Sequence, residues 1–306
     1  MMDSKDFITR VIAAEELKNS EKLEAMKFGD FSYFCYGGAR TEALNIIDTS
    51  NGTNFNSMFY NCSHLTTVPK LNTSKGTNFS GMFFSCQSLT SIPDLDTSNG
   101  TNFDSMFYNC SNLTTIPKLN TSNGTNFKNM FQNCSHLTTI PKLNTSKGTN
   151  FSGMFYICRS LTSIPDLDTS NGTDFSNMFF ACISLTTIPE LNIGNGTNFN
   201  NMFQNCSSLT NLTIYNIRKS ITIGSGTSWG HLLTVDSLVH TIQELCTASS
   251  SQTLTMGSAN LNKIANIYCK VIDGSNEKKT MELCESTDEG AMTLTAYANM
   301  KNWNLA

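Results

Sequence analysis

Cysteine is the side chain of this sequence with the most chemistry to offer, as a metal ligand, a nucleophile or half of a disulfide. The chain has 306 residues and 11 cysteines. Seven of them recur at intervals of 24 residues: Cys62, Cys86, Cys110, Cys134, Cys158, Cys182 and Cys206. A zinc site needs about four ligands converging on one point, and no Cys-x-x-Cys pair occurs. We therefore predict a row of buried free thiols and no metal site, although disulfides between stacked repeats about 5 Å apart stay possible by distance.

The other titratable side chains follow the same spacing and indicate no catalytic site. His64 and His136 are copies of one position 72 residues apart, so they cannot share a site and are expected on the surface. The pair Asp94 and Asp96 recurs 72 residues later. No His-Glu-x-x-His, P-loop or dinucleotide-binding motif occurs. We predict a non-enzymatic protein without cofactor or metal; an enzyme within residues 216–306 is the alternative.

Composition excludes several classes of partner. Charged residues make up 14% of the chain and the net charge is −4, so no strong positive field is available to hold nucleic acid. No segment approaches the roughly 18 consecutive apolar residues of a membrane span. The first 30 residues hold no apolar core typical of a secretory signal. We expect neither a nucleic acid nor a membrane as partner.

The 24-residue interval also predicts the elements that position these side chains. Phenylalanine recurs at this interval from Phe55 to Phe199, and leucine recurs from Leu65 to Leu209. All six prolines follow the same interval, and seven units run from Asp48 to Tyr215. A period of 20–29 residues is typical of leucine-rich repeats, whose units bury their apolar faces only by stacking. The fold class predicted is an α/β repeat: a leucine-rich-repeat solenoid of 24-residue coils, each with a short helix and a short parallel strand, and with N- and C-terminal caps.

Within one unit, the spacing of apolar residues assigns the two elements. Phe55, Met58, Phe59 and Cys62 lie at i, i+3, i+4 and i+7, the apolar face of a short helix. Residues 65–71 then predict a short strand with its leucines and valine inward, limited by the proline that cannot donate to a ladder. Gly52 is expected to adopt positive φ in the turn before the helix.

Three segments are predicted along the chain. Residues 1–47 hold much of the charge and form a helical cap or an attachment or oligomerisation segment. Residues 48–215 form the seven-coil solenoid. Residues 216–306 form a C-terminal capping module, with strands at 220–224, 252–257 and 267–272 and helices at 235–246 and 292–303.

Two surface rows are the candidate ligand-binding residues. Aromatic side chains in a row could stack on sugar rings, or they could pack against adjacent coils; the row is Tyr60, Phe84, Tyr108, Gln132, Tyr156, Phe180 and Gln204. Charged side chains of a second row follow the strand and could pair weakly between coils; they are Lys70, Asp94, Lys118, Lys142, Asp166 and Glu190.

The unit TSNGTNFNSMFYNCSHLTTVPKLN resembles the BspA-like leucine-rich surface repeats of bacteria, with Met-Phe, Cys and Leu in the same phase. That resemblance implies an adhesin or another ligand-binding surface protein. The segments LTVDSLVHTIQELC, SQTLTMGSANLNKI and KNWNLA are similar to the closing part of repeat proteins from phage and prophage tails of Gram-positive gut bacteria. That second resemblance implies a receptor-binding role on a virion.

The function predicted first is therefore a receptor-binding, tail-fibre or baseplate component, located on a virion tail that assembles in the host cytoplasm. It would bind a bacterial surface glycan or protein and contact other tail proteins through its N-terminal segment. The alternative is a BspA-like adhesin or host-interaction protein on the bacterial surface. A homo-oligomer stays open.

Overall fold

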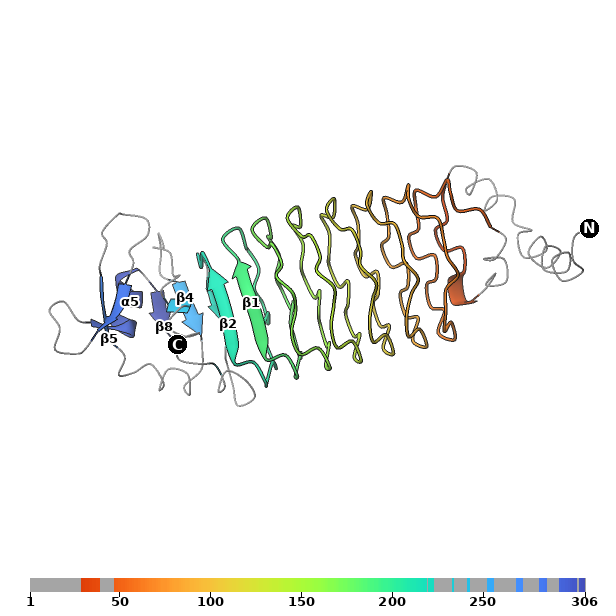
Figure 1. Cartoon of the computed structure of the whole chain (residues 1–306). Helices are drawn as coiled ribbons and strands as arrows, with labels where there is room; N and C mark the ends of the chain where they lie inside the picture. The colour runs from red at the N-terminus through yellow and green to blue at the C-terminus, as the bar shows by residue number, and fades with distance from the viewer. Residues whose placement is uncertain are drawn as a thin grey trace, which may run out of the picture.

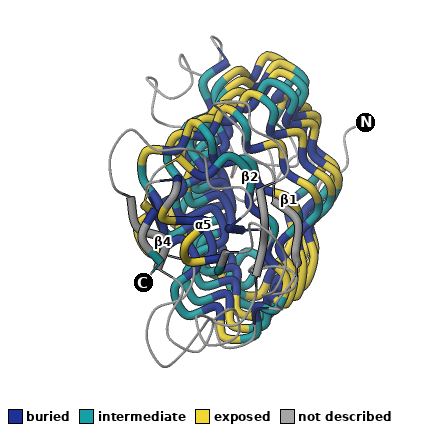
Figure 2. The backbone as a smooth tube through the Cα atoms, turned by 90° about the vertical axis from the view of Figure 1, so that its left-hand side faces the viewer, coloured by how far each residue is buried: buried dark blue, intermediate teal, exposed yellow. Residues whose placement is uncertain are grey.

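The structure is a computed structural model that describes residues 29–38, 47–218, 220–222, 233, 241–242, 252–255, 268–271, 281–284, 292–301 and 303–305. Figure 1 shows the repeats as coils stacked side by side into an elongated rod. Seen nearly along the rod, the buried positions of successive coils superimpose on its inner side (Figure 2). The repeat solenoid with a 24-residue period is confirmed.

A ladder of hydrogen bonds joins each coil to the next along the segment that carries phenylalanine and methionine. The backbone N–H groups of Phe55, Ser57, Phe59 and Asn61 donate to carbonyl oxygens of the following coil, over 2.7–2.9 Å. The N–H groups between them close tight turns, as Met58 N donates to Phe55 O. We call this segment, residues 53–62 and its equivalents, the turn ladder. Of the ten N–H groups of residues 53–62, six therefore bond between coils and four within one coil.

The short helix predicted for this segment is wrong. An α-helix needs negative φ at every residue and keeps its hydrogen bonds within the segment, whereas Ser57 has a φ of 53° and Asn61 a φ of 59°. A run of tight turns of alternating hand places the same side chains inward as a helix would. Spacing at i, i+3, i+4 and i+7 cannot distinguish the two.

A signal for the turn ladder is present in the sequence at the two positions with positive φ. Left-handed backbone is tolerated by Gly and, among other residues, by Asn. The first position holds Ser57, Gly81, Ser105, Asn129, Gly153, Asn177 and Asn201. The second holds Asn61, Ser85, Asn109, Asn133, Ile157, Ala181 and Asn205. Apart from Ile157, both positions hold small residues or asparagine, which favour turns over a helix.

The predicted strand is regular only in the last two coils. β1 (Thr187–Asn192) and β2 (Asn211–Tyr215) pair in parallel, with a register shift between Ile188 and Leu191. Among the other described coils this stretch is extended and forms isolated bridges at most, such as Ser163 with Thr187. Six of the seven coils have a proline here, which cannot donate to the ladder, so the turn ladder supplies most of the bonding between coils.

The core is a set of parallel rows of identical side chains. Phe127 stacks between Phe103 and Phe151 with ring centroids 5.8 and 5.7 Å apart, and it is fully buried. Phe107 and Phe131 form a second row, 5.6 Å apart. Each coil thus covers the apolar side chains of its neighbours.

The stack begins earlier than the boundary predicted at residue 48. Residues 29–38, which end in the 3-10 helix η1 (Tyr36–Gly38), form a further coil on the first complete one. Phe31 stacks on Phe55 at 5.7 Å, and Phe31 N donates to Asn54 O over 2.8 Å. The helical cap or attachment segment was assigned to residues 1–47, of which residues 1–28 and 39–46 lie outside the described residues.

Gly52 is required for space and not for positive φ. Its φ is outside the left-handed region, but a Cβ built on it would lie 2.2 Å from Cζ of Phe55. The same ring contact occurs in each later coil, for example 2.6 Å between Gly100 and Phe103. The phenylalanine row therefore excludes any side chain at this turn.

The C-terminal residues continue the stack and add a hairpin. β3 (Ile221–Thr222), β4 (Gln252–Thr255) and β8 (Trp303–Leu305) form a parallel sheet in that order. β5 (Tyr268–Val271) pairs antiparallel with β6 (Met281–Cys284) and with β7 (Met292–Thr293). α5 (Leu294–Met300) follows, with Thr293 as its N-cap.

The strands predicted near residues 220, 252 and 267 are present as β3, β4 and β5. The helix predicted at 292–303 is shorter, because residues 292–293 belong to β7 and Trp303 to β8. Leu294, Tyr297 and Ala298 of α5 are buried, as expected, and Trp303 is also buried. Of the helix predicted at 235–246, only Thr241 and Ile242 are described, and both are helical.

Candidate ligand-binding groove

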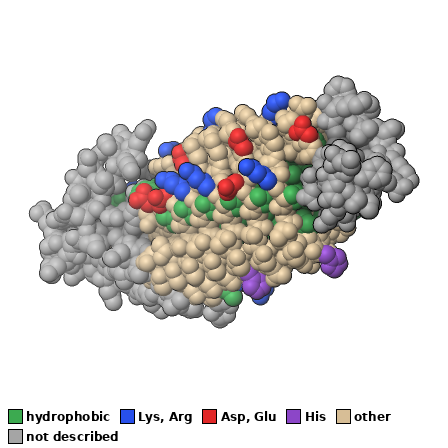
Figure 3. Space-filling model, turned by 45° about the vertical axis from the view of Figure 1, so that its right-hand side comes forward, with side chains coloured by type: hydrophobic (Ala, Val, Ile, Leu, Met, Phe, Trp, Pro, Cys, Tyr) green, Lys and Arg blue, Asp and Glu red, His purple; other side chains and the backbone are tan. Residues whose placement is uncertain are grey.

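A shallow groove of about 1350 Å³ follows the rod on the side of the predicted strands, across several consecutive coils. The middle coils each contribute the same five positions, a charged residue followed by Leu, Asn or Asp, Thr and Ser. In one coil these are Lys118, Leu119, Asn120, Thr121 and Ser122. Figure 3 shows charged side chains in a row along this face, next to a line of hydrophobic side chains.

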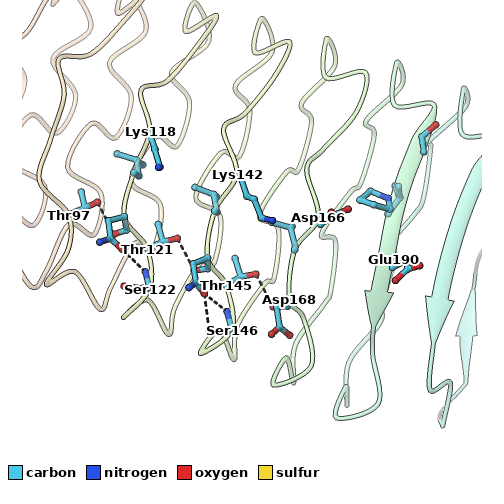
Figure 4. Close-up of a pocket in the computed structure, with 18 of the residues that line it drawn as sticks. Thr97, Lys118, Thr121, Ser122, Lys142, Thr145, Ser146, Asp166, Asp168 and Glu190 are labelled. Carbon is cyan, nitrogen blue, oxygen red and sulfur yellow. Dashed lines mark hydrogen bonds between the residues drawn. The ribbon is translucent and has the colours of Figure 1, made fainter.

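Buried threonines fix the wall of the groove. Thr121 Oγ1 donates to Asn144 O of the next coil over 2.8 Å, and Thr145 Oγ1 donates to Asp168 O over the same distance. The next residue is held by an Asx turn, in which Ser122 N donates to Asn120 Oδ1 over 3.2 Å. Because each wall residue bonds to a neighbour, the groove is defined by backbone geometry and not by mobile side chains (Figure 4).

The charged row lies in this groove, as the sequence suggested for a binding surface. Lys118, Lys142, Asp166 and Glu190 line it. Lys70 and Asp94 line a second hollow of about 630 Å³ further toward the N-terminus. All six side chains are exposed.

The weak pairs between coils that the row predicted are not formed. Within the described residues, no side chain of the row makes an ion pair or a hydrogen bond, although Lys142 extends toward Asp166 (Figure 4). In the groove the charged row therefore provides two unpaired basic groups followed by two unpaired acidic groups. Such exposed charges are available to a ligand.

A further carboxylate of the groove is held in its charged form. Asp96 Oδ1 accepts hydrogen bonds from the Ser98 hydroxyl, over 2.6 Å, and from Ser98 N, over 3.0 Å. These bonds favour the carboxylate, so they lower the pKa of Asp96 below its usual value. Asp168 and Ser170 repeat the geometry.

The repeats match a known family over most of their length. The family described as "Mycoplasma protein of unknown function, DUF285" matches residues 30–140 and 125–225. The chain belongs to the DUF285 family. Its match begins at the coil that stacks ahead of the predicted boundary, at residues 29–38.

Two further comparisons concern this DUF285 protein. Among solved structures it is similar to the leucine-rich repeat protein TpLRR of T. pallidum, with 16% identity and a TM-score of 0.42, over 60% of this chain and 84% of that one. No curated protein matches it.

The aromatic row of the DUF285 protein lies outside the groove. Phe84 stacks between Tyr60 and Tyr108 with centroids 4.6 and 4.3 Å apart, and Tyr156 stacks on Phe180 at 4.8 Å. Gln132 Nε2 donates to Tyr108 Oη over 3.3 Å. Each ring covers the face of the next, so only ring edges are exposed between them. This geometry favours packing between coils over stacking on sugars; Gln204, at the end of the row, is half-buried.

The described cysteines of the repeats are free and buried, as predicted. Each thiol donates to a carbonyl oxygen of the preceding coil, as Cys134 Sγ does to Phe107 O over 3.0 Å. Burial raises the pKa of Cys110 to about 12, because a thiolate would lose its hydration. Within the described part of the chain, no group of three or more potential ligands is placed to hold a metal ion. Nor does any described helix have the length and hydrophobicity to cross a membrane.

Proposed function

We propose that this DUF285 protein is a non-catalytic binding protein of the bacterial surface, an adhesin or host-interaction protein of the kind implied by its BspA-like repeats. The proposal depends on one observation. The groove brings together unpaired charges from four consecutive coils, Lys118, Lys142, Asp166 and Glu190, on a wall whose backbone groups are held between coils. A rigid, extended and polar surface is suited to binding a polymer and has no enclosed pocket for a reaction.

The role on a phage tail, implied by the C-terminal segments, stays a prediction. The partners assigned to it, tail and baseplate proteins, would contact the N-terminal segment 1–47, most of which lies outside the described residues. The groove could bind a ligand either on a virion tail or on the bacterial surface. We favour the bacterial surface because that role does not require contacts with other tail proteins.

Binding of fluorescent full-length protein to intact cells tests the proposal. A panel of bacteria and epithelial cells would be stained and measured by flow cytometry. Ser122 lines the groove, and no hydrogen bond of its hydroxyl is lost on substitution, so Ser122→Trp adds bulk inside the groove. Gln87 is exposed and lies outside every described hollow, so Gln87→Trp is the matched control.

We expect Ser122→Trp to reduce staining at least fivefold, and Gln87→Trp to leave it unchanged. Circular dichroism would show that both variants are folded. Equal staining by the two variants would mean that the groove is not the binding surface. Absence of staining by the unaltered protein on every cell type would count against a surface-binding role as a whole.

A further inference from the structure

The order of charges in the groove indicates what kind of ligand it takes. Along the rod the charged row contributes Lys118, Lys142, Asp166 and Glu190 to the groove, in that order. Two basic groups are thus followed by two acidic groups. All four are exposed and unpaired within the described structure, so each can bind a group of opposite charge on a ligand. Two further carboxylates of the groove, Asp96 and Asp168, already accept hydrogen bonds from Ser98 and Ser170 of their own coils.

The spacing of the coils is compatible with an extended polypeptide. On the groove side the parallel strands β1 and β2 pair, and paired strands lie about 4.8 Å apart. In an extended chain every second side chain points to the same face, at intervals of about 6.6 Å. A peptide that lies along the groove therefore presents one side chain to each coil. The mismatch is about 1.8 Å per step, or about 5 Å over the three steps from Lys118 to Glu190. Long Lys and Glu side chains on both the peptide and the groove can reach across it.

Two other classes of polymer fit the groove less well. A nucleic acid would bring phosphates against Asp166 and Glu190, where like charges repel. A neutral glycan would gain little from the four charges, and no aromatic side chain is among the residues lining the groove. Leucines on its floor and Thr and Asn on its wall instead offer apolar contact and hydrogen bonds to a peptide backbone.

We infer that the groove binds an extended polypeptide segment with four charged side chains at alternate positions. Two neighbouring charges are acidic and the other two are basic, and the segment can run in either direction along the groove. This inference rests on the proposed function and specifies the ligand of the same groove. The acidic half lies over Lys118 and Lys142, and the basic half over Asp166 and Glu190.

Fluorescence anisotropy with labelled peptides tests the charge order directly, with full-length protein at low salt. The block peptide is Glu-Ser-Glu-Ser-Lys-Ser-Lys, and the control of identical composition is Glu-Ser-Lys-Ser-Glu-Ser-Lys. In the groove the block peptide makes four favourable charge contacts. The control makes two favourable and two unfavourable contacts. We expect the block peptide to bind about tenfold more tightly, and the difference to diminish at 0.5 M NaCl.

Two charge variants distinguish order from general attraction. K118E/K142E makes the groove acidic throughout, so it should lose the block peptide and bind Lys-Ser-Lys-Ser-Lys-Ser-Lys instead. K118E/K142E/D166K/E190K reverses the order, and a linear peptide can reverse its direction, so affinity for the block peptide should stay within about threefold. All four positions are exposed, and unchanged melting temperatures would show that both variants fold.

Equal affinity for the block and control peptides would overturn the inference, as would unchanged binding by K118E/K142E. If neither peptide binds while Ser122→Trp still abolishes staining of cells, the ligand is not this class of peptide and the proposed function stands. If Ser122→Trp leaves staining unchanged, the proposed function itself fails.

Discussion

Ile157 is held in a backbone conformation that its side chain disfavours, and this gives the sharpest test of the turn ladder. Its φ is 59°, in the left-handed region, where a β-branched residue is an outlier. The equivalent position holds Asn109 and Asn133 in preceding coils. We predict that Ile157→Asn stabilises the protein.

The magnitude follows from two gains and one loss. Left-handed backbone costs a residue other than glycine about 1–2 kcal/mol, and asparagine avoids part of that cost. In the coils before it, Asn133 Nδ2 donates to Asn109 Oδ1 over 2.6 Å, so a new amide can donate to Asn133 in turn, for about 0.5–1 kcal/mol. Loss of the half-buried isoleucine side chain costs about 1 kcal/mol. The free energy of unfolding should rise by about 1 kcal/mol.

Urea denaturation followed by circular dichroism would measure the change. Ile183→Asn is the matched control, because Ile183 is 42% exposed and its φ lies outside the left-handed region. That variant should change the free energy of unfolding by less than about 0.5 kcal/mol. The reverse change, Asn133→Ile, should destabilise by about 1–2 kcal/mol. If this segment were a helix, Ile157→Asn would lower the free energy of unfolding and Asn133→Ile would raise it. That result would refute the turn ladder.

Three further predictions concern the stack. Phe127→Ala should lower the free energy of unfolding by about 3–5 kcal/mol, because the ring is fully buried between two others; an unchanged melting temperature would show that this face is not core. Thiols with raised pKa values, such as Cys110 at about 12, stay protonated in the folded state while those of the unfolded chain ionise above about pH 8.5. The free energy of unfolding should therefore fall as pH rises from about 8.5 to 9.5, with a slope approaching 1.4 kcal/mol per pH unit for each such thiol, and Cys110→Ala should make that slope smaller in urea titrations. Deletion of residues 216–306 removes Ile221, Leu294 and Trp303 from the core that they share with the repeats, and the apolar surface left exposed should cause aggregation; a soluble folded monomer in analytical ultracentrifugation would contradict the cap assignment.

The candidate groove could be predicted only in part. The charged row is visible in the sequence because Lys118, Lys142, Asp166 and Glu190 share one phase of the repeat. The lack of ion pairs in this row cannot be predicted from the sequence, because it depends on the distance between exposed charged groups of adjacent coils. The aromatic row was predicted equally well from its phase, yet Phe84 and its neighbours cover one another's faces.

The sequence by itself determined that the chain is a stack of 24-residue coils with Phe, Met, Cys and Leu inside. A fixed period of apolar residues leaves no other way to bury them. Asparagine and small residues at the two positions with positive φ favour turns in the phenylalanine segment, but only the tertiary structure decided that these turns form a ladder between coils. A helix and a run of turns place the same side chains inward, but their N–H groups bond to different acceptors. Phe59 N donates to Met82 O, which lies in another coil. A bond to a residue 23 positions away leaves no local apolar pattern, so stacking alone selects it.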